Sequence, residues 1–118
     1  MNIIPYGKQN ITDDDINAVV KTLNGDFLTQ GPKVKEFENK FADYVGAKYT
    51  VAVNNATSGL HLAVLALGLK EGERVITSPI TFAASANCIR YARGEVWFAD
   101  IDPDTYLLCL ESTKKLIE

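Results

Sequence analysis

The stretch VAVNNATSGLHLAVLALG, at residues 51–68, decides the fold of this chain. Residues 51–53 predict a short buried strand, and the apolar residues 60–67 have the length and composition of a buried helix. The polar turn between them, 54–59, consists of small residues. A helix that starts from such a turn presents unpaired backbone N–H groups and the positive end of its dipole, which together favour an anion. The sequence therefore predicts a phosphorylated ligand at Ala56–Gly59.

Strands and helices alternate from Tyr49 onward. The sequence predicts strands at 49–53, 74–77 and 95–99, with helices at 57–67, closed by Gly68, and at 82–92, closed by Gly94. The order βαβαβ predicts a parallel sheet with right-handed crossovers, in which ligands lie outside the carboxyl ends of the strands. Because the polar turns 54–59 and 78–81 both follow strand ends, we expect them to face one site.

Two amphipathic helices precede this alternation. Thr12 is the expected N-cap of the first helix, three aspartates follow in its first turn, and Gly25 ends it. Its apolar residues recur at helical spacing and are expected to pack inward: Ile16, Val19, Val20 and Leu23. The second helix is expected from Pro32 to about Tyr44, with Gly46 after its end. The chain is thus divided into an N-terminal helical segment, 1–46, and the start of an α/β domain, 47–118.

Composition excludes several classes of partner. The 118 residues carry 12 lysines and arginines against 15 acids, a net charge of −3 without a basic cluster, so nucleic acid is not an expected partner. No apolar run reaches the roughly 18 residues of a membrane helix, and the N-terminus lacks a signal-peptide pattern. Cys88 and Cys109 have no neighbouring histidine, which predicts no metal site and no disulfide framework. We expect a soluble, cytoplasmic chain without a membrane partner.

The last residues, ESTKKLIE at 111–118, start like a helix but have no stop signal. This pattern is typical either of a frayed terminal helix or of the N-terminal part of a longer protein, and we favour the second interpretation.

Few residues carry recognisable chemistry. Thr57 and Ser58 offer hydroxyl and backbone N–H donors, although such residues also serve as ordinary helix caps. The turn is neither a Rossmann fingerprint nor a P-loop. Phe82, after a strand-end loop, is either a core residue or a surface for a planar cofactor ring. His61 lies one turn into its helix and is interpreted as a packing or surface residue, and the loop FLTQGP at 27–32 could be a plain interhelical turn.

Four linked motifs resemble the DegT/DnrJ/StrS family of sugar-nucleotide aminotransferases. They are LTQGPKVKEFE at 28–38, YVGAKYTVAVNNATSGLHLAVLALG at 44–68, GERVITSPITFAASAN at 72–87 and FADIDPDT at 98–105. The resemblance covers nearly the whole chain. It implies an α/β fold, namely the N-terminal part of the large domain of fold type I enzymes that depend on pyridoxal 5'-phosphate (PLP), with a mainly parallel sheet and flanking helices. Within the family, the motifs look most like the branch that serves pseudaminic acid synthesis.

The resemblance also implies roles for residues. Thr57 and Ser58 match the pair that holds the cofactor phosphate, and Phe82 matches the aromatic residue that stacks on the pyridine ring. Tyr6, Thr29 and Gln30 lie in segments that approach the sugar nucleotide. The implied reaction moves an amino group from L-glutamate to C4 of a UDP-linked 4-keto-6-deoxy N-acetyl hexose, in a homodimer.

No lysine of this chain stands in the family's Schiff-base motif, so no catalytic residue is assigned and the fragment alone is expected to be inactive. Other members of the family carry a histidine in place of that lysine and are sugar dehydratases, and some are thought to be regulatory. A non-catalytic module that binds a phosphorylated ligand or a partner remains a third hypothesis.

Overall fold

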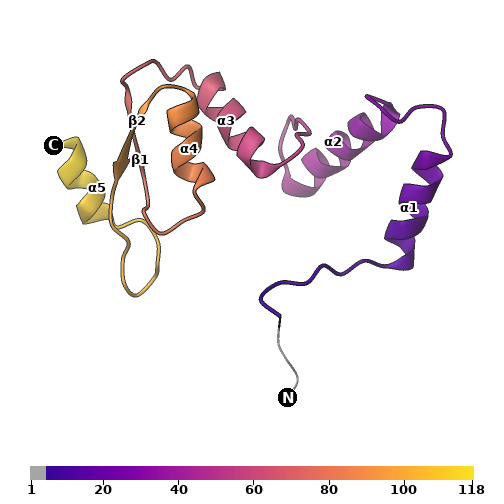
Figure 1. The fold of residues 1–118 in the computed structure, drawn as a ribbon, viewed down its shortest axis with the longest axis horizontal. Coiled ribbons are helices and arrows are strands. Elements are labelled where there is room, and N and C mark those ends of the chain that lie inside the picture. Colours follow the sequence, from indigo (N-terminus) through magenta and orange to yellow (C-terminus); the bar gives the residue numbers. More distant parts are fainter. Residues whose placement is uncertain (1–4) are drawn as a thin grey trace. The chain divides into compact units, whose positions relative to one another are not determined.

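The computed structural model describes residues 5–118, and the chain divides into two compact units between Ala52 and Val53 (Figure 1). The first unit contains the helices α1 (Asp13–Leu23) and α2 (Pro32–Val45). The second contains α3 (Ala56–Ala66), β1 (Arg74–Thr77), α4 (Ala84–Tyr91), β2 (Glu95–Phe98) and α5 (Leu110–Ile117). None of the helices among the described residues is both long and apolar enough to cross a membrane.

The predicted start of α1 is confirmed. The Thr12 side chain accepts a hydrogen bond from the backbone N–H of Asp15 at 3.4 Å, and the Asp15 carboxylate accepts one from the backbone N–H of Thr12 at 2.8 Å. This reciprocal pair is a capping box, which satisfies two of the donors that a helix N-terminus leaves free. The bond from the Thr12 N–H holds the pKa of Asp15 below its ordinary value.

The prediction that one face of α1 packs inward is wrong for this structure. Ile16, Val19, Val20 and Leu23 are all exposed, and no residue of α1 is buried. An amphipathic helix buries its apolar stripe only when another element covers it, and α2 does not pack along α1. The apolar face exists as predicted, but among the described residues of the first unit, 5–52, nothing covers it.

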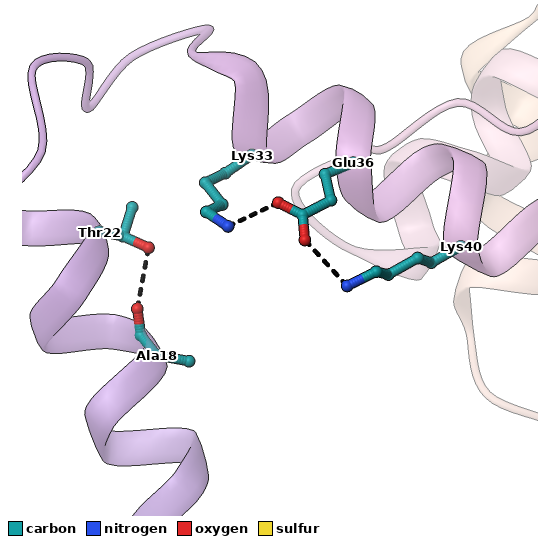
Figure 2. Close-up of polar contacts among 5 residues, drawn as sticks. All are labelled: Ala18, Thr22, Lys33, Glu36 and Lys40. Atoms are coloured by element: carbon teal, nitrogen blue, oxygen red, sulfur yellow. Dashed lines mark hydrogen bonds and ion pairs between the residues drawn. The ribbon is translucent and has the colours of Figure 1, made fainter.

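Helix α2 has the expected ends. Pro32 occupies its first turn, and Gly46 closes it with a φ of +69°, a left-handed conformation that glycine adopts without steric cost. On its surface the Glu36 carboxylate bridges Lys33 at 2.5 Å and Lys40 at 2.8 Å (Figure 2). The hydrogen bond from Lys33, followed by that from Lys40, lowers the pKa of Glu36 to about 2. These contacts support the helix locally and involve no residue of a predicted site.

The predicted strand at 49–53 does not form. A strand needs a neighbour to take its backbone hydrogen bonds, and within residues 5–118 no strand pairs with residues 49–53. Glu38 of α2 supplies acceptors instead: its carboxylate accepts the backbone N–H of Ala52 at 3.0 Å, and its carbonyl accepts the hydroxyl of Thr50. Val51, predicted to be buried, is 77% exposed.

The second unit has the predicted parallel arrangement. Strands β1 and β2 pair in parallel, with Arg74 opposite Glu95 and Thr77 opposite Phe98. The bounds of β1 are those predicted, and β2 ends one residue early. Helix α4 begins two residues later than predicted, because the carbonyl of Phe82 accepts the N–H of Ser85 in a turn that precedes the helix. The sheet of the described residues has two of the three predicted strands.

The core of the second unit lies on α4 and at the sheet. Ala84, Cys88 and Ile89 of α4 are buried, as are Ala92 and Ala99, and Ile89 is only 2% exposed. Helix α3 packs beside α4 (Figure 1). The rings of His61 and Tyr91 meet there edge to face, with their centroids 5.4 Å apart. The prediction of a buried helix at 60–67 is wrong, because no residue of α3 is buried. Helix α3 carries apolar residues on more of its surface than α4 covers, so several of them stay exposed.

Asp102 organises the turn after β2. Its carboxylate accepts the N–H groups of Thr105 at 2.8 Å and of Asp104 at 3.1 Å, and the chain returns through an antiparallel bridge between Ile101 and Leu108. The bond from the Thr105 N–H lowers the pKa of Asp102. The carboxylate is therefore occupied by its own turn, as is usual for aspartate in such loops.

The capping box makes Thr12 the residue whose loss most weakens α1. Thr12→Ala is expected to lower the free energy of unfolding of α1 by about 1 kcal/mol, because the N–H of Asp15 loses its acceptor. Circular dichroism and amide hydrogen exchange across residues 13–23 would measure the change. Thr22→Ala is the control, since the Thr22 hydroxyl only bonds the Ala18 carbonyl within the helix at 2.9 Å (Figure 2). An equal loss in both variants would contradict the role of the cap.

Close packing around Gly94 makes it sensitive to an added methyl group. A Cβ at this position would lie 2.7 Å from Leu69 Cδ2, 2.9 Å from Ile89 Cγ2 and 3.1 Å from the Glu73 carbonyl. Gly94→Ala is expected to lower the free energy of unfolding by about 1–3 kcal/mol, because the core must shift to admit it. Urea denaturation would measure this. Gly7→Ala is the control, because nothing lies within 4 Å of a Cβ at this position, and it should leave the free energy of unfolding unchanged.

Candidate functional site

The polar turn 54–59 is built around the cap of α3. Asn55 is the N-cap: its side-chain oxygen accepts the N–H of Ser58 at 2.8 Å, and its carbonyl accepts the N–H of Gly59 at 3.2 Å. Sequence reasoning singled out Thr57 and Ser58 but not Asn55. The asparagine immediately before the first helical residue is the signal that could have identified it.

Four donors of this turn remain available. Within residues 5–118, no acceptor pairs with the backbone N–H of Ala56 or Thr57, and no hydrogen bond occupies the hydroxyl of Thr57 or Ser58. Thr57, Ser58 and Gly59 are half-buried. Free N–H groups at the positive end of a helix, joined by two hydroxyls, form a donor set that suits a phosphate or carboxylate group.

Phe82 lies in the loop between β1 and α4. Its side chain is 78% exposed, so the alternative of a core phenylalanine does not hold in this structure. The loop is shaped by its own hydroxyls: Ser78 accepts the N–H of Ile80 at 3.1 Å, and Thr81 and Ser85 are 3.3 Å apart. In Figure 1, α3 and α4 start from the same end of the second unit, so the turn 54–59 and the loop that carries Phe82 occupy that end together.

Thr29 and Gln30 belong to the loop between α1 and α2. Gln30 has a φ of +49°, in the left-handed region that favours glycine, and its side chain is exposed. Gly31 beside it leaves no room for a side chain, because a Cβ would lie 2.8 Å from Phe27 Cβ and 3.0 Å from the Phe27 carbonyl. The loop is therefore more constrained than a plain interhelical turn.

The predicted site residues divide between the two units. Tyr6, Thr29 and Gln30 belong to the first unit, and Thr57, Ser58 and Phe82 belong to the second. Tyr6 is fully exposed and has no hydrogen-bond partner among the described residues. His61 packs on Tyr91, which agrees with the interpretation of His61 as a packing residue.

Three hollows of the first unit are not lined by Tyr6, Thr29 or Gln30, although one of them is lined by Phe27 and Pro32 at the two ends of the loop that carries Thr29 and Gln30. One of about 420 Å³ is lined by Ala18, Val19, Thr22, Leu23 and Leu28, and it is open and mostly apolar. It carries no charged side chain and none of the residues that the motifs point to. We therefore locate the candidate site at the start of α3 and not in this hollow.

The chain is similar to known proteins over most of its length. The chain matches the DegT/DnrJ/EryC1/StrS aminotransferase family over residues 9–118. It is 48% identical over 102 residues to UDP-4-amino-4,6-dideoxy-N-acetyl-beta-L-altrosamine transaminase of Campylobacter jejuni subsp. jejuni serotype O:23/36, covering 86% of this chain and 27% of that protein.

Two solved structures share its fold. The PLP form of Spr1654 from Streptococcus pneumoniae, named as a sugar aminotransferase, superposes with a TM-score of 0.90 at 32% identity, covering 95% of this chain and 29% of that one. GDP-4-keto-6-deoxy-D-mannose-3-dehydratase of E. coli, with hydrated PLP bound, has a TM-score of 0.90 at 27% identity, covering 97% of this chain and 31% of that one.

The chain spans less than a third of the length of these relatives. The predicted α/β fold class is confirmed, since the chain has the fold of the corresponding part of PLP-dependent sugar aminotransferases. The match over residues 9–118 is decisive, and the chain belongs to the DegT/DnrJ/EryC1/StrS aminotransferase family.

Proposed function

We propose that the whole protein is a PLP-dependent sugar-nucleotide aminotransferase and that this chain provides its phosphate-binding turn. The observation that carries the proposal is the start of α3, where the N–H groups of Ala56 and Thr57 and the hydroxyls of Thr57 and Ser58 have no partner among residues 5–118. Residues 47–118 would then be the start of the PLP-binding large domain.

The residues present fit the cofactor. A phosphate group accepts several hydrogen bonds and carries negative charge, and the half-buried start of α3 offers donors and a positive dipole. Thr57 and Ser58 would hold the phosphate, while the exposed ring of Phe82 would lie against the flat pyridine ring and exclude water from one of its faces. Bound PLP supplies the electron sink that amino-group transfer requires.

The proposed substrate is a UDP-linked 4-keto-6-deoxy N-acetyl hexose, with L-glutamate as the amino donor, in pseudaminic acid synthesis. The similarity to the Campylobacter jejuni transaminase supports this choice. Tyr6, Thr29 and Gln30 are the proposed contacts to the sugar nucleotide. The left-handed backbone of Gln30 supports its role, because strain of this kind persists where function requires it. We propose a cytoplasmic homodimer, with the catalytic lysine supplied from outside these 118 residues.

A sugar dehydratase is the second candidate. It is favoured by one observation, the TM-score of 0.90 with the E. coli dehydratase. The residues described here serve both reactions equally well, because holding the cofactor phosphate and ring is common to them. A test must therefore identify the sugar product, which carries an amino group after transamination and lacks a hydroxyl group after dehydration.

The full-length protein, supplied with PLP, L-glutamate and the UDP-4-keto sugar, is expected to form 2-oxoglutarate and an amino sugar in equal amounts. Replacing both hydroxyl donors, in Thr57→Val with Ser58→Ala, is expected to raise the dissociation constant of PLP at least tenfold, since two hydrogen bonds to a charged group are lost. Mass spectrometry of the product and titration of the PLP absorbance would measure the two effects.

Thr113→Ala is the matched control, because its hydroxyl bonds the Cys109 carbonyl at 2.9 Å in α5. A deoxygenated sugar without an amino group would favour the dehydratase. Absence of any PLP absorbance band in the full-length protein would reject the enzyme and leave the non-catalytic module.

Gln30 allows stability and substrate binding to be separated. Gln30→Gly is expected to raise the free energy of unfolding by about 1 kcal/mol, because glycine adopts a positive φ without the cost that glutamine bears. The same change removes the proposed sugar-nucleotide contact, so KM for the sugar nucleotide should rise while PLP affinity stays constant. Thermal unfolding and steady-state kinetics measure the two effects.

Thr29→Gly is the control for stability, since Thr29 has no positive φ and gains nothing from glycine. A Gln30→Gly variant that is more stable and has an unchanged KM would show that the conformation of Gln30 does not serve substrate binding.

A further inference from the structure

Glu38 holds the chain segment that leads to the phosphate turn. Its carboxylate accepts the backbone N–H of Ala52 at 3.0 Å, and its own carbonyl accepts the hydroxyl of Thr50. Thr50 and Ala52 are thus both tied to Glu38, the first through its side-chain hydroxyl and the second through its backbone N–H. One residue of α2 therefore fixes two successive points of the segment, as a neighbouring strand would.

The contact is built more firmly than the other acidic contacts of α2. The Glu38 side chain is 15% exposed, whereas Glu36 is 43% exposed and bonds only to lysine side chains. Lys35 approaches the other oxygen of Glu38 at 3.3 Å but is itself 71% exposed. The N–H of Ala52, ahead of Lys35, is the main cause of the lowered pKa of Glu38, so the carboxylate is charged and accepts strongly at neutral pH.

Only one residue, Val53, separates Ala52 from the turn 54–59. Ala52 is followed by Val53 and Asn54, and Asn55 then caps α3. Val53 lies beside the turn, since a Cβ built on Gly59 would be 3.5 Å from Val53 Cγ2. With so few residues between them, the freedom of the chain at Ala52 limits the freedom with which it enters the turn.

We propose that Glu38 is a positioning residue for the phosphate turn: by holding Thr50 and Ala52 it restrains the chain that enters residues 54–59. The proposal rests on the proposed function, in which Thr57 and Ser58 bind the PLP phosphate. Glu38 itself touches no ligand. Under this proposal Glu38 affects cofactor binding only through the groups that bind the phosphate. Its loss should therefore weaken the binding of PLP more than the binding of a compound without the phosphate.

The test compares the dissociation constants of PLP and of pyridoxal, which lacks the phosphate, for the cofactor-free full-length protein. In Glu38→Ala, the preference for PLP over pyridoxal is expected to fall about tenfold, because donors that are no longer restrained bind a phosphate less well. Glu38→Gln keeps an oxygen that accepts the Ala52 N–H and should retain the preference within about twofold. Thr50→Val removes the hydrogen bond from the Thr50 hydroxyl to the Glu38 carbonyl and should lower the preference to a smaller extent. This variant replaces Glu38→Ala in the test if Glu38→Ala does not fold.

Glu36→Ala is the matched control, because it removes an equal charge from the same helix and leaves the segment 49–52 untouched. Hydrogen exchange of the Ala52 amide should accelerate in Glu38→Ala and not in Glu36→Ala. A fall in affinity by the same factor for both compounds would indicate general destabilisation and overturn the proposal, as would an unchanged preference. A wild-type protein with no preference for PLP would overturn the proposed function as well, so the two failures are distinguishable.

Discussion

Parallel pairing of β1 with β2 is the constraint on which the second unit depends. Two parallel strands cannot be joined by a tight turn, so the chain must cross back over the sheet, and α4 is that crossover. The crossover explains why the core is concentrated on Ala84, Cys88 and Ile89, the residues of α4 that are buried. It also explains the tight packing around Gly94, where the chain leaves α4 and enters β2 beside Leu69 and Ile89.

The same constraint gathers the candidate chemistry. In a parallel sheet every loop that follows a strand opens at one edge, and this places the loop that carries Phe82 before the start of α4. Helix α3 packs beside α4 and starts from the same end (Figure 1), and the N–H groups of Ala56 and Thr57 at its start have no acceptor within residues 5–118. The candidate site thus combines a helix N-terminus, four hydrogen-bond donors and one exposed aromatic ring, and it contains no buried charge.

The first unit has a different character. Its two helices are well formed locally, by the capping box at Thr12 and by Gly46 in the left-handed conformation, yet their apolar faces are exposed. Local stability thus comes from caps and from pairs such as Glu36 with Lys33 and Lys40. Glu38 is the exception among the acids of α2, since its contacts reach beyond the helix to Thr50 and Ala52.

The sequence by itself determined the features that local chemistry controls. The N-cap at Thr12, the ends of α2 and the bounds of β1 could be predicted, because each depends on residues within a few positions of one another. The parallel order could be predicted from the alternation of strands and helices, since a helix between two strands carries the chain back across the sheet. Only the tertiary structure decided what covers an apolar face, which is why the expected burial of α1, α3 and Val51 was wrong. Periodicity records that a face is apolar and says nothing about the surface that buries it.

The bond between Glu38 and Ala52 joins residues 14 positions apart and leaves no local pattern, so the segment 49–53 was predicted as a strand. The left-handed backbone of Gln30 was equally invisible, because nothing in the sequence around a glutamine signals a positive φ.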